Sequence, residues 1–130
     1  MTEEIRTGTV GVGKGAVKVC LGFPANKPVF SPETATKGHD THHERHARNM
    51  GLTLKEWKQE AADLLNAEPA PAYLDWYQPD IKVFRRYDLR TGRLVSGTNE
   101  GEVKTYFDLD KSKRRIYLPK EYLALSRRKN

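Results

Sequence analysis

The chain has 130 residues, of which 37% are hydrophobic and 31% charged, and its formal net charge is +6. This length predicts a single domain over residues 1–130 with a modest core. The sequence has no long apolar run, which excludes a transmembrane helix, and its single cysteine, Cys20, excludes an internal disulfide. Cys20 lies in an apolar stretch, so we interpret it as a small hydrophobic side chain rather than a nucleophile.

Residues 1–37 form a segment rich in glycine and proline, in which alternating apolar residues predict one strand at about 16–22. Residues 8–15 nearly match a Walker A phosphate loop, but Gly15 replaces the Ser or Thr whose hydroxyl holds magnesium. No helix-forming sequence follows, so we expect these glycines to serve a turning N-terminal strand. Pro24, Pro28 and Pro32 predict an extended connector after the strand.

Two helices are predicted over residues 38–68. Each begins with a capping box, at residues 41–44 and 53–56, in which a threonine and a glutamate satisfy each other's backbone N–H groups. Gly51 is placed to end the first helix, and prolines 69 and 71 stop the second.

The hydrophobic period changes to two from residue 80. This pattern predicts strands at 81–87, 94–98 and 103–107, joined by tight turns, with residues 116–118 as a candidate fourth strand. Helices followed by an antiparallel meander over residues 80–118 predict an α+β fold.

The positive charge is concentrated at the C-terminal end of the sequence. Residues 111–130 contain eight basic residues and one acidic residue, whereas residues 1–110 contain 15 basic and 16 acidic residues. A basic end on a near-neutral body favours a polyanionic partner, nucleic acid above all. A solvated basic tail at residues 119–130 fits the same charge pattern.

All four histidines lie at residues 39–46. The unperturbed pKa of histidine lies closer to neutral pH than that of any other side chain. The cluster therefore indicates either proton transfer at an anionic substrate or a metal site. His42 and His46 are four residues apart and share a helix face. A metal needs further ligands, and the sequence has neither an HExxH motif nor paired cysteines, so we predict no metal and no cofactor. We expect His39 and His43 to cap, pack or face solvent, and His46 to point toward the sheet.

Alternation along the strands predicts which side chains share a face. Arg85 and Arg86 point to opposite faces of one strand, and Lys104 and Thr105 to opposite faces of another, with Thr105 on the side of Val103 and Phe107. An inward arginine and an inward threonine on adjacent strands would hold a phosphate with a fork of donors and a hydroxyl. The alternative for each of these charges is an ordinary solvated strand face.

These parts suffice for RNA cleavage without a metal, because RNA supplies its own nucleophile in the 2′-hydroxyl. A histidine would move the protons, with His46 as general base or acid and His42 as partner, and cations with a hydroxyl would stabilise the charge on phosphorus. The candidate catalytic residues are His46, His42, Arg86, Arg85, Lys104 and Thr105. The basic segment would hold the RNA backbone, and the candidate RNA-binding residues are Lys113, Arg114, Arg115 and Tyr106.

Residues 38–118 also carry a family pattern: His-x-x-Arg-His at 42–46, a second helix, and a meander that ends in Lys-Thr-Tyr-Phe at 104–107. This pattern resembles the C-terminal nuclease domains of bacterial polymorphic and contact-dependent inhibition toxins with the barnase–EndoU–colicin–RelE type of fold. One departure is Ala47, where a glycine is common in the family.

The resemblance implies helices packed on a twisted antiparallel meander, with the active site across their junction. It implies a metal-independent ribonuclease, often acting on tRNA, whose functional residues fall on the positions named above. It also implies a cognate immunity protein as partner, and a secreted or delivered effector that acts in the cytoplasm of the target cell. Two alternatives remain: a non-enzymatic module that binds nucleic acid or a partner, and a metal-assisted nuclease that uses His42 and His46.

Overall fold

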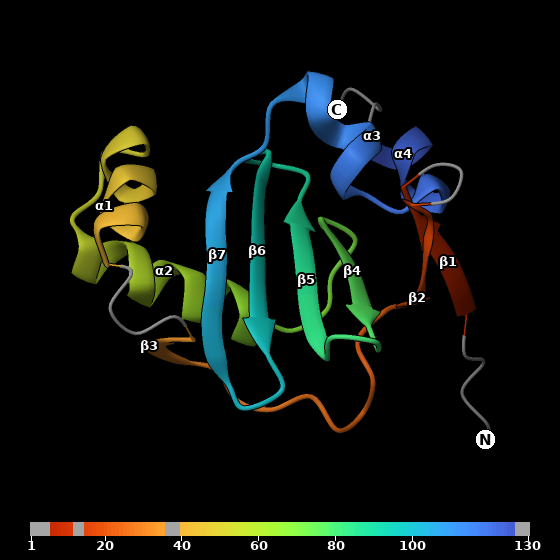
Figure 1. Ribbon diagram of the computed structural model, residues 1–130, viewed down its shortest axis with the longest axis horizontal. Helices are drawn as coiled ribbons and strands as arrows, with labels where there is room; N and C mark the ends of the chain where they lie inside the picture. Colours follow the sequence, from red (N-terminus) through yellow and green to blue (C-terminus); the bar gives the residue numbers. More distant parts are fainter. Residues whose placement is uncertain (1–5, 12–14, 36–39, 127–130) are drawn as a thin grey trace.

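One mixed sheet forms the centre of the fold in the computed structural model, which describes residues 6–11, 15–35 and 40–126 (Figure 1). Its strands are β1 Arg6–Val10, β2 Val17–Leu21, β3 Ser31–Thr34, β4 Tyr73–Gln78, β5 Val83–Asp88, β6 Arg93–Thr98 and β7 Glu102–Asp108. They are ordered β1-β2-β4-β5-β6-β7-β3 across the sheet. Neighbouring strands are antiparallel except β3 and β7, which pair in parallel. The predicted α+β class is confirmed.

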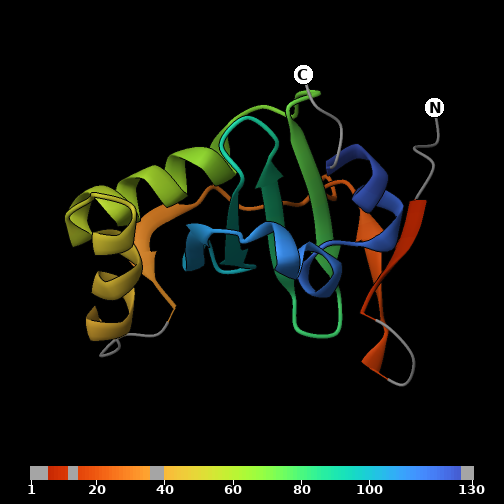
Figure 2. The same cartoon turned by 90° about the horizontal axis from the view of Figure 1, so that it is seen from above.

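Helices precede and follow the meander. They are α1 Asp40–Asn49, α2 Leu54–Asn66, the 3-10 helix η2 Lys111–Lys113, α3 Arg114–Tyr117 and α4 Lys120–Ser126. Seen from above in Figure 2, α2 lies on one side of the sheet and the η2–α3 segment on the other. None of the helices in the described part of the chain is long and apolar enough to cross a membrane.

The turn between α1 and α2 follows the predicted local rules. Gly51 adopts φ +74°, and the N–H groups of Gly51 and Leu52 donate to the carbonyls of Arg48 and Ala47 at 3.0 and 2.8 Å, which is a Schellman ending. The capping box of the second helix is confirmed by reciprocal hydrogen bonds between Thr53 and Glu56. The box predicted at Thr41 is wrong, because α1 begins at Asp40 and Thr41 is already inside its first turn.

Two hydrophobic clusters cover the two faces of the sheet. Trp57, Ala61 and Leu65 of α2 pack with Phe84 and Val95 on one face. On the other face, the strand residues Trp76, Tyr87 and Leu94 pack with Leu118 and Tyr122 from the C-terminal helices. The sheet is therefore covered on both faces. Successive residues of a strand point alternately to the α2 side and to the side of the C-terminal helices.

The first half of β7 and its second half have different neighbours. β3 pairs only with Glu102 and Val103 at the start of β7. Beyond that point α1 lies beside β7. Figure 1 shows α1 to the left of the second half of this strand. The short parallel strand therefore leaves the second half of β7 open to side chains from α1.

The prediction of one strand in residues 1–37 is wrong, because β1, β2 and β3 all lie there. Other local predictions also need correction. The segment around Pro32 is the edge strand β3 rather than a simple connector, and Tyr73–Gln78 forms β4, which was not predicted. Residues 116–118, expected to extend the meander, end the helix α3 instead. The expected tail at 119–130 contains the folded helix α4, whose Tyr122 is buried and donates a hydrogen bond to the carbonyl of Asp75 at 2.8 Å.

Candidate active site

A cleft of about 520 Å³ opens between α1 and the segment that follows β7, over one face of β5, β6 and β7. Its walls come from three separated parts of the sequence. The first part is α1 and the residue after it, with His42, His46, Asn49 and Met50. The second is β5 and β6, with Arg85 and Leu94. The third is β7 and the segment after it, with Thr105, Phe107, Asp108, Leu109, Asp110, Lys113 and Tyr117. In Figure 1, α1 stands on one side of β7, and α3 lies beyond β6 on the other side.

His46 lies half-buried on the α1 wall. Its ring is 5.6 Å from the ring of Phe107 and 4.8 Å from that of the exposed His42, between ring centroids. Burial lowers the pKa of His46, and repulsion from His42 and Arg45 lowers it further. His46 is therefore neutral near pH 7 and has a lone pair available to accept a proton. The expectation that it points toward the sheet is confirmed by its contact with Phe107.

His43 packs in the core rather than lining the cleft. Its side chain is only 2% exposed, and its ring stacks on Trp57 with the centroids 4.8 Å apart. Burial lowers its pKa, with a further contribution from His42. This agrees with the packing role expected for His43, and the prediction for His39 falls outside the described residues.

Arg85 and Thr105 form a row with Ser96 across three strands. The register pairs Arg85 of β5 with Ser96 of β6, and Ser96 with Thr105 of β7. The hydroxyls of Ser96 and Thr105 share a hydrogen bond, and Arg85 Nη2 donates to Gln78 Oε1 at 3.1 Å. The predicted arginine and threonine therefore share a face and a cleft, although β6 separates their strands.

The guanidinium of Arg85 is partly buried in the cleft. Burial lowers the pKa of Arg85, and attraction to Asp80, or to Tyr117 whenever that side chain is ionised, opposes that shift. A partly desolvated guanidinium interacts strongly with an anion, because little water competes with the contact. Arg85 is therefore suited to hold a phosphate.

Arg86 lies on the opposite face of β5, away from the cleft. Its side chain is 0% exposed, and Nε and Nη2 donate to the two carboxylate oxygens of Asp75 at 2.6 and 2.9 Å. Nη1 donates to the carbonyls of Leu64 and Ala67, both at 2.7 Å. The side chain thus ties β5 to β4 and to the C-terminal end of α2, where a cation is favourable. The geometry gives Arg86 a structural position rather than the candidate catalytic one.

A β-bulge at Lys104 separates Val103 from the face of β7 that carries Thr105. Thr105 is opposite Ser96, but Val103 is already opposite Gly97, so Lys104 is an extra residue in β7. Val103 consequently packs with Tyr106 on the α2 side. The expectation that Val103 shares a side with Thr105 is wrong, since strict alternation fails across a bulge.

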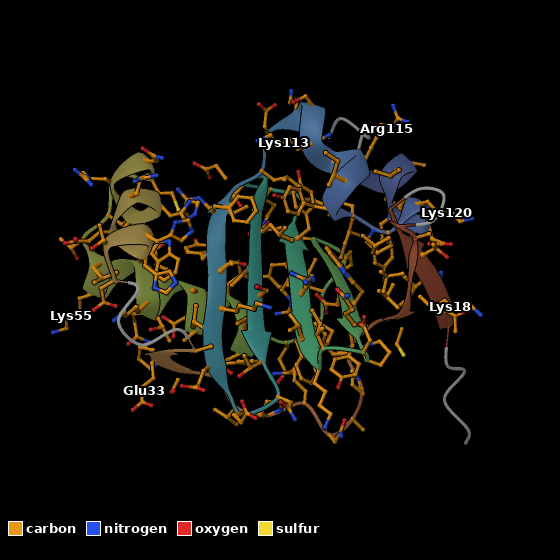
Figure 3. The ribbon with its side chains drawn as sticks, viewed as in Figure 1. Lys18, Glu33, Lys55, Lys113, Arg115 and Lys120 are labelled. Carbon is orange, nitrogen blue, oxygen red and sulfur yellow. The ribbon has the colours of Figure 1, made fainter. Side chains whose placement is uncertain are left out.

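The four candidate RNA-binding residues separate into two pairs. Lys113 is exposed and lines the cleft, and Figure 3 shows it near the end of β7. Arg115 is also exposed, but it lines a separate hollow and lies farther from β7 than Lys113 does. Arg114 instead donates from Nη1 to the carbonyl of Ser126 at 2.8 Å, which holds α4. Tyr106 is buried, and its hydroxyl donates to Glu60 Oε1 at 3.3 Å. Arg114 and Tyr106 therefore stabilise the fold, and their polar groups are engaged within the protein.

Two acidic side chains also line the cleft, and both are engaged as acceptors. Arg93 Nε donates to Asp108 Oδ1 at 3.0 Å. The N–H of Ser112 donates to Asp110 at 3.0 Å, and this hydrogen bond lowers the pKa of Asp110. Asp110 is therefore ionised at neutral pH. Its charge offsets part of the positive charge that Lys113 and Arg85 bring to the cleft.

Sequence reasoning did not assign a role to Asn49 or Tyr117. Asn49 lies three residues after His46, a spacing that puts both on one helix face, so the helical periodicity contained that signal. Tyr117 was expected in a strand, and no sequence pattern pointed to its place opposite α1. No group of three or more His, Cys, Asp or Glu side chains in the described residues is arranged to hold a metal ion.

Searches against models of known protein families, curated proteins and solved structures found no match to this chain. The chemistry of the cleft is therefore the basis of the functional assignment.

Proposed function

We propose that this protein is a metal-independent endoribonuclease that cleaves RNA by attack of the 2′-hydroxyl on the adjacent phosphate. One observation carries the proposal: the half-buried imidazole of His46 opens onto the same cleft as Arg85 and Thr105. A single phosphodiester in this cleft would meet a proton acceptor, a guanidinium and a hydroxyl together.

His46 is the general base in this mechanism. Burial lowers its pKa, so the imidazole is neutral at physiological pH and can accept the 2′-hydroxyl proton. A positioned acid or base contributes about 10²–10⁴-fold to such a reaction. His42, whose ring lies beside that of His46, is the partner predicted from the sequence.

Arg85, Thr105 and Lys113 are the phosphate-holding groups. Arg85 approaches from the sheet, Thr105 offers its hydroxyl from β7, and Lys113 extends from the far wall. Fixed donors directed at the charge that develops on phosphorus contribute about 10²–10³-fold each. Lys104, Arg86, Arg114 and Tyr106 take no part in this arrangement.

The biological setting follows from the resemblance to toxin nuclease domains. The substrate would be tRNA, the partner a cognate immunity protein that blocks the cleft, and the protein an effector delivered into the cytoplasm of a target cell. These proposals depend on the ribonuclease assignment and fail with it.

The test is cleavage of total cellular RNA by the purified protein, with and without EDTA, for wild type, His46→Ala and Arg85→Met. We expect wild-type cleavage that EDTA leaves unchanged, and a loss of at least about 10²-fold in each variant. Arg48→Met is the matched control, because it removes a cation from the exposed side of α1 without touching the cleft. Full activity in His46→Ala would remove this residue from the mechanism.

The two alternatives predict different outcomes. A metal-assisted nuclease loses activity in EDTA and contains a stoichiometric ion after purification from unsupplemented medium. A non-enzymatic binding module shows no cleavage, and its RNA binding survives His46→Ala but weakens when the exposed cations Lys113, Arg115 and Lys120 are neutralised. Neutralisation is the appropriate perturbation, since deletion of residues 111–130 would remove the buried Leu118 and Tyr122.

A further inference from the structure

The two histidines of the cleft lie on the same wall. His42 and His46 both project from α1, and their rings contact each other at 4.8 Å. In-line displacement at phosphorus puts the attacking 2′-oxygen and the departing 5′-oxygen on opposite sides of the phosphorus atom. A base on the α1 wall therefore calls for a proton donor on the other wall.

Tyr117 is a proton donor on that other wall. The ring of Phe107 lies between the two walls: its centroid is 5.6 Å from that of His46, and also 5.6 Å from that of Tyr117. Tyr117 comes from α3, which Figures 1 and 2 show separated from α1 by the sheet strands. Its side chain is 38% exposed and lines the cleft, so its hydroxyl is accessible to a substrate.

The other polar groups on that side are less suited to protonate an alkoxide. Asp108 accepts from Arg93, and Asp110 accepts from the N–H of Ser112, which keeps it ionised. Lys113 is exposed at the rim, where its charge is best used to attract phosphate. Arg85 interacts electrostatically with Tyr117, so a transient phenolate would have a cation beside it.

We propose that Tyr117 is the general acid of the reaction, donating its phenolic proton to the departing 5′-oxygen while His46 accepts the 2′-hydroxyl proton. This assignment rests on the proposed ribonuclease function. The bond from the 2′-oxygen to phosphorus forms, and the bond from phosphorus to the 5′-oxygen breaks. The products are a 2′,3′-cyclic phosphate and a 5′-hydroxyl, and a proton passes from the imidazolium to the phenolate through water to restore the enzyme.

Leaving-group substitution tests the assignment. The linkage that the wild type cleaves is placed in a short RNA oligonucleotide, in one version with its natural 5′-oxygen and in another with sulfur at that bridging position. A thiolate departs without protonation, because thiols are far stronger acids than alcohols. We expect Tyr117→Phe to cleave the oxygen substrate at least about 10²-fold more slowly than wild type, and the sulfur substrate at close to the wild-type rate.

Three controls make the result specific. His46→Ala should slow cleavage of both substrates, because the base acts before the leaving group departs. Lys113→Ala also slows both alike, as expected for a phosphate contact. Tyr77→Phe, which removes a hydroxyl from a ring packed on Phe84 on the α2 side, retains the wild-type rate on both. Thermal melts should show that each variant keeps the wild-type fold.

Several outcomes would overturn the assignment while leaving the ribonuclease proposal in place. These are full activity of Tyr117→Phe on the oxygen substrate, equal losses on both substrates, and rescue by sulfur in His42→Ala instead of Tyr117→Phe. If the wild type cleaves no RNA linkage, the ribonuclease proposal fails first, and the role of Tyr117 falls with it.

Discussion

Arg85 and Arg86 are neighbours in sequence on opposite faces of β5, and we predict that their replacement by methionine has opposite consequences. Arg86→Met should destabilise the fold, whereas Arg85→Met should remove catalysis with a small loss of stability. The reason is the environment of Arg86, which is fully buried and gives two hydrogen bonds to Asp75 and two to the end of α2. Methionine would leave the carboxylate of Asp75 buried without its cation.

The magnitude follows from that uncompensated charge. Removing one partner of a buried ion pair costs about 3–5 kcal/mol. A chain of 130 residues has an unfolding entropy of roughly 0.27 kcal/mol/K, so the expected fall in Tm is about 11–18 °C. Since whole domains are stable by only about 5–15 kcal/mol, this loss is a large share of the total.

The assay pairs thermal unfolding, followed by circular dichroism, with RNA cleavage well below the Tm of each variant. Asp75→Asn combined with Arg86→Met should lose less than the sum of the two single losses, because the double variant buries no unpaired charge. The structural assignment of Arg86 would be refuted by a variant that keeps the wild-type Tm but loses cleavage.

Three further predictions concern titration and charge. Because burial lowers the pKa of His46, kcat/KM should rise with pH through an apparent pKa below the ordinary histidine value of about 6.5, and His46→Ala should abolish that limb of the profile. The free energy of unfolding should fall as pH is lowered below about 6.5, because His43 and His46 bind protons at a higher pH in the unfolded chain than in the folded chain. Urea titrations over this pH range should show a smaller fall for His43→Phe than for the wild type. Lys113→Ala should reduce the slope of log binding constant against log salt concentration by about 0.7–0.9, whereas Lys55→Ala, which Figure 3 shows far from Lys113, should leave it unchanged.

The sequence correctly predicted a turn, a cap and strands that depend on residues close together in the chain. The turn at Gly51 and the capping box at Thr53 depend on residues within three or four positions of each other, and both were found where expected. The three central meander strands were also predicted, because each alternates between two buried faces. The prediction that Arg85 and Arg86 point to opposite faces of one strand was correct for the same reason.

Two of the missed strands, β3 and β4, depend on partners distant in sequence. β4 is built around Asp75, a charged residue that discourages a strand prediction until Arg86 is known to lie opposite it in the register. β3 contains Pro32, and it exists because the start of β7 offers it a parallel partner about 70 residues later. No window of local sequence contains either pairing.

The bulge at Lys104 changed the predicted faces of β7. Alternation alone gives Thr105 and Val103 the same side, and it makes Lys104 a candidate on the other side. The inserted residue shifts Val103 into the core beneath α2 and leaves Thr105 in the cleft beside Phe107. A sequence pattern shows the period of a strand but not the position at which its partner stops matching it.

The wall of the cleft opposite α1 is formed by the segment after β7, and this wall exists because the basic C-terminal segment is folded. The sequence predicts either a strand at residues 116–118 or a solvated tail, and neither would place Tyr117 opposite His46. Leu118, which is 1% exposed, and the buried Tyr122 anchor this segment on the sheet face that also carries Leu94. Burial at positions 118 and 122 therefore fixes α3, and α3 presents Tyr117 and the preceding Lys113 to the cleft. Substitutions that loosen this anchor should weaken catalysis without touching any group that contacts the phosphate.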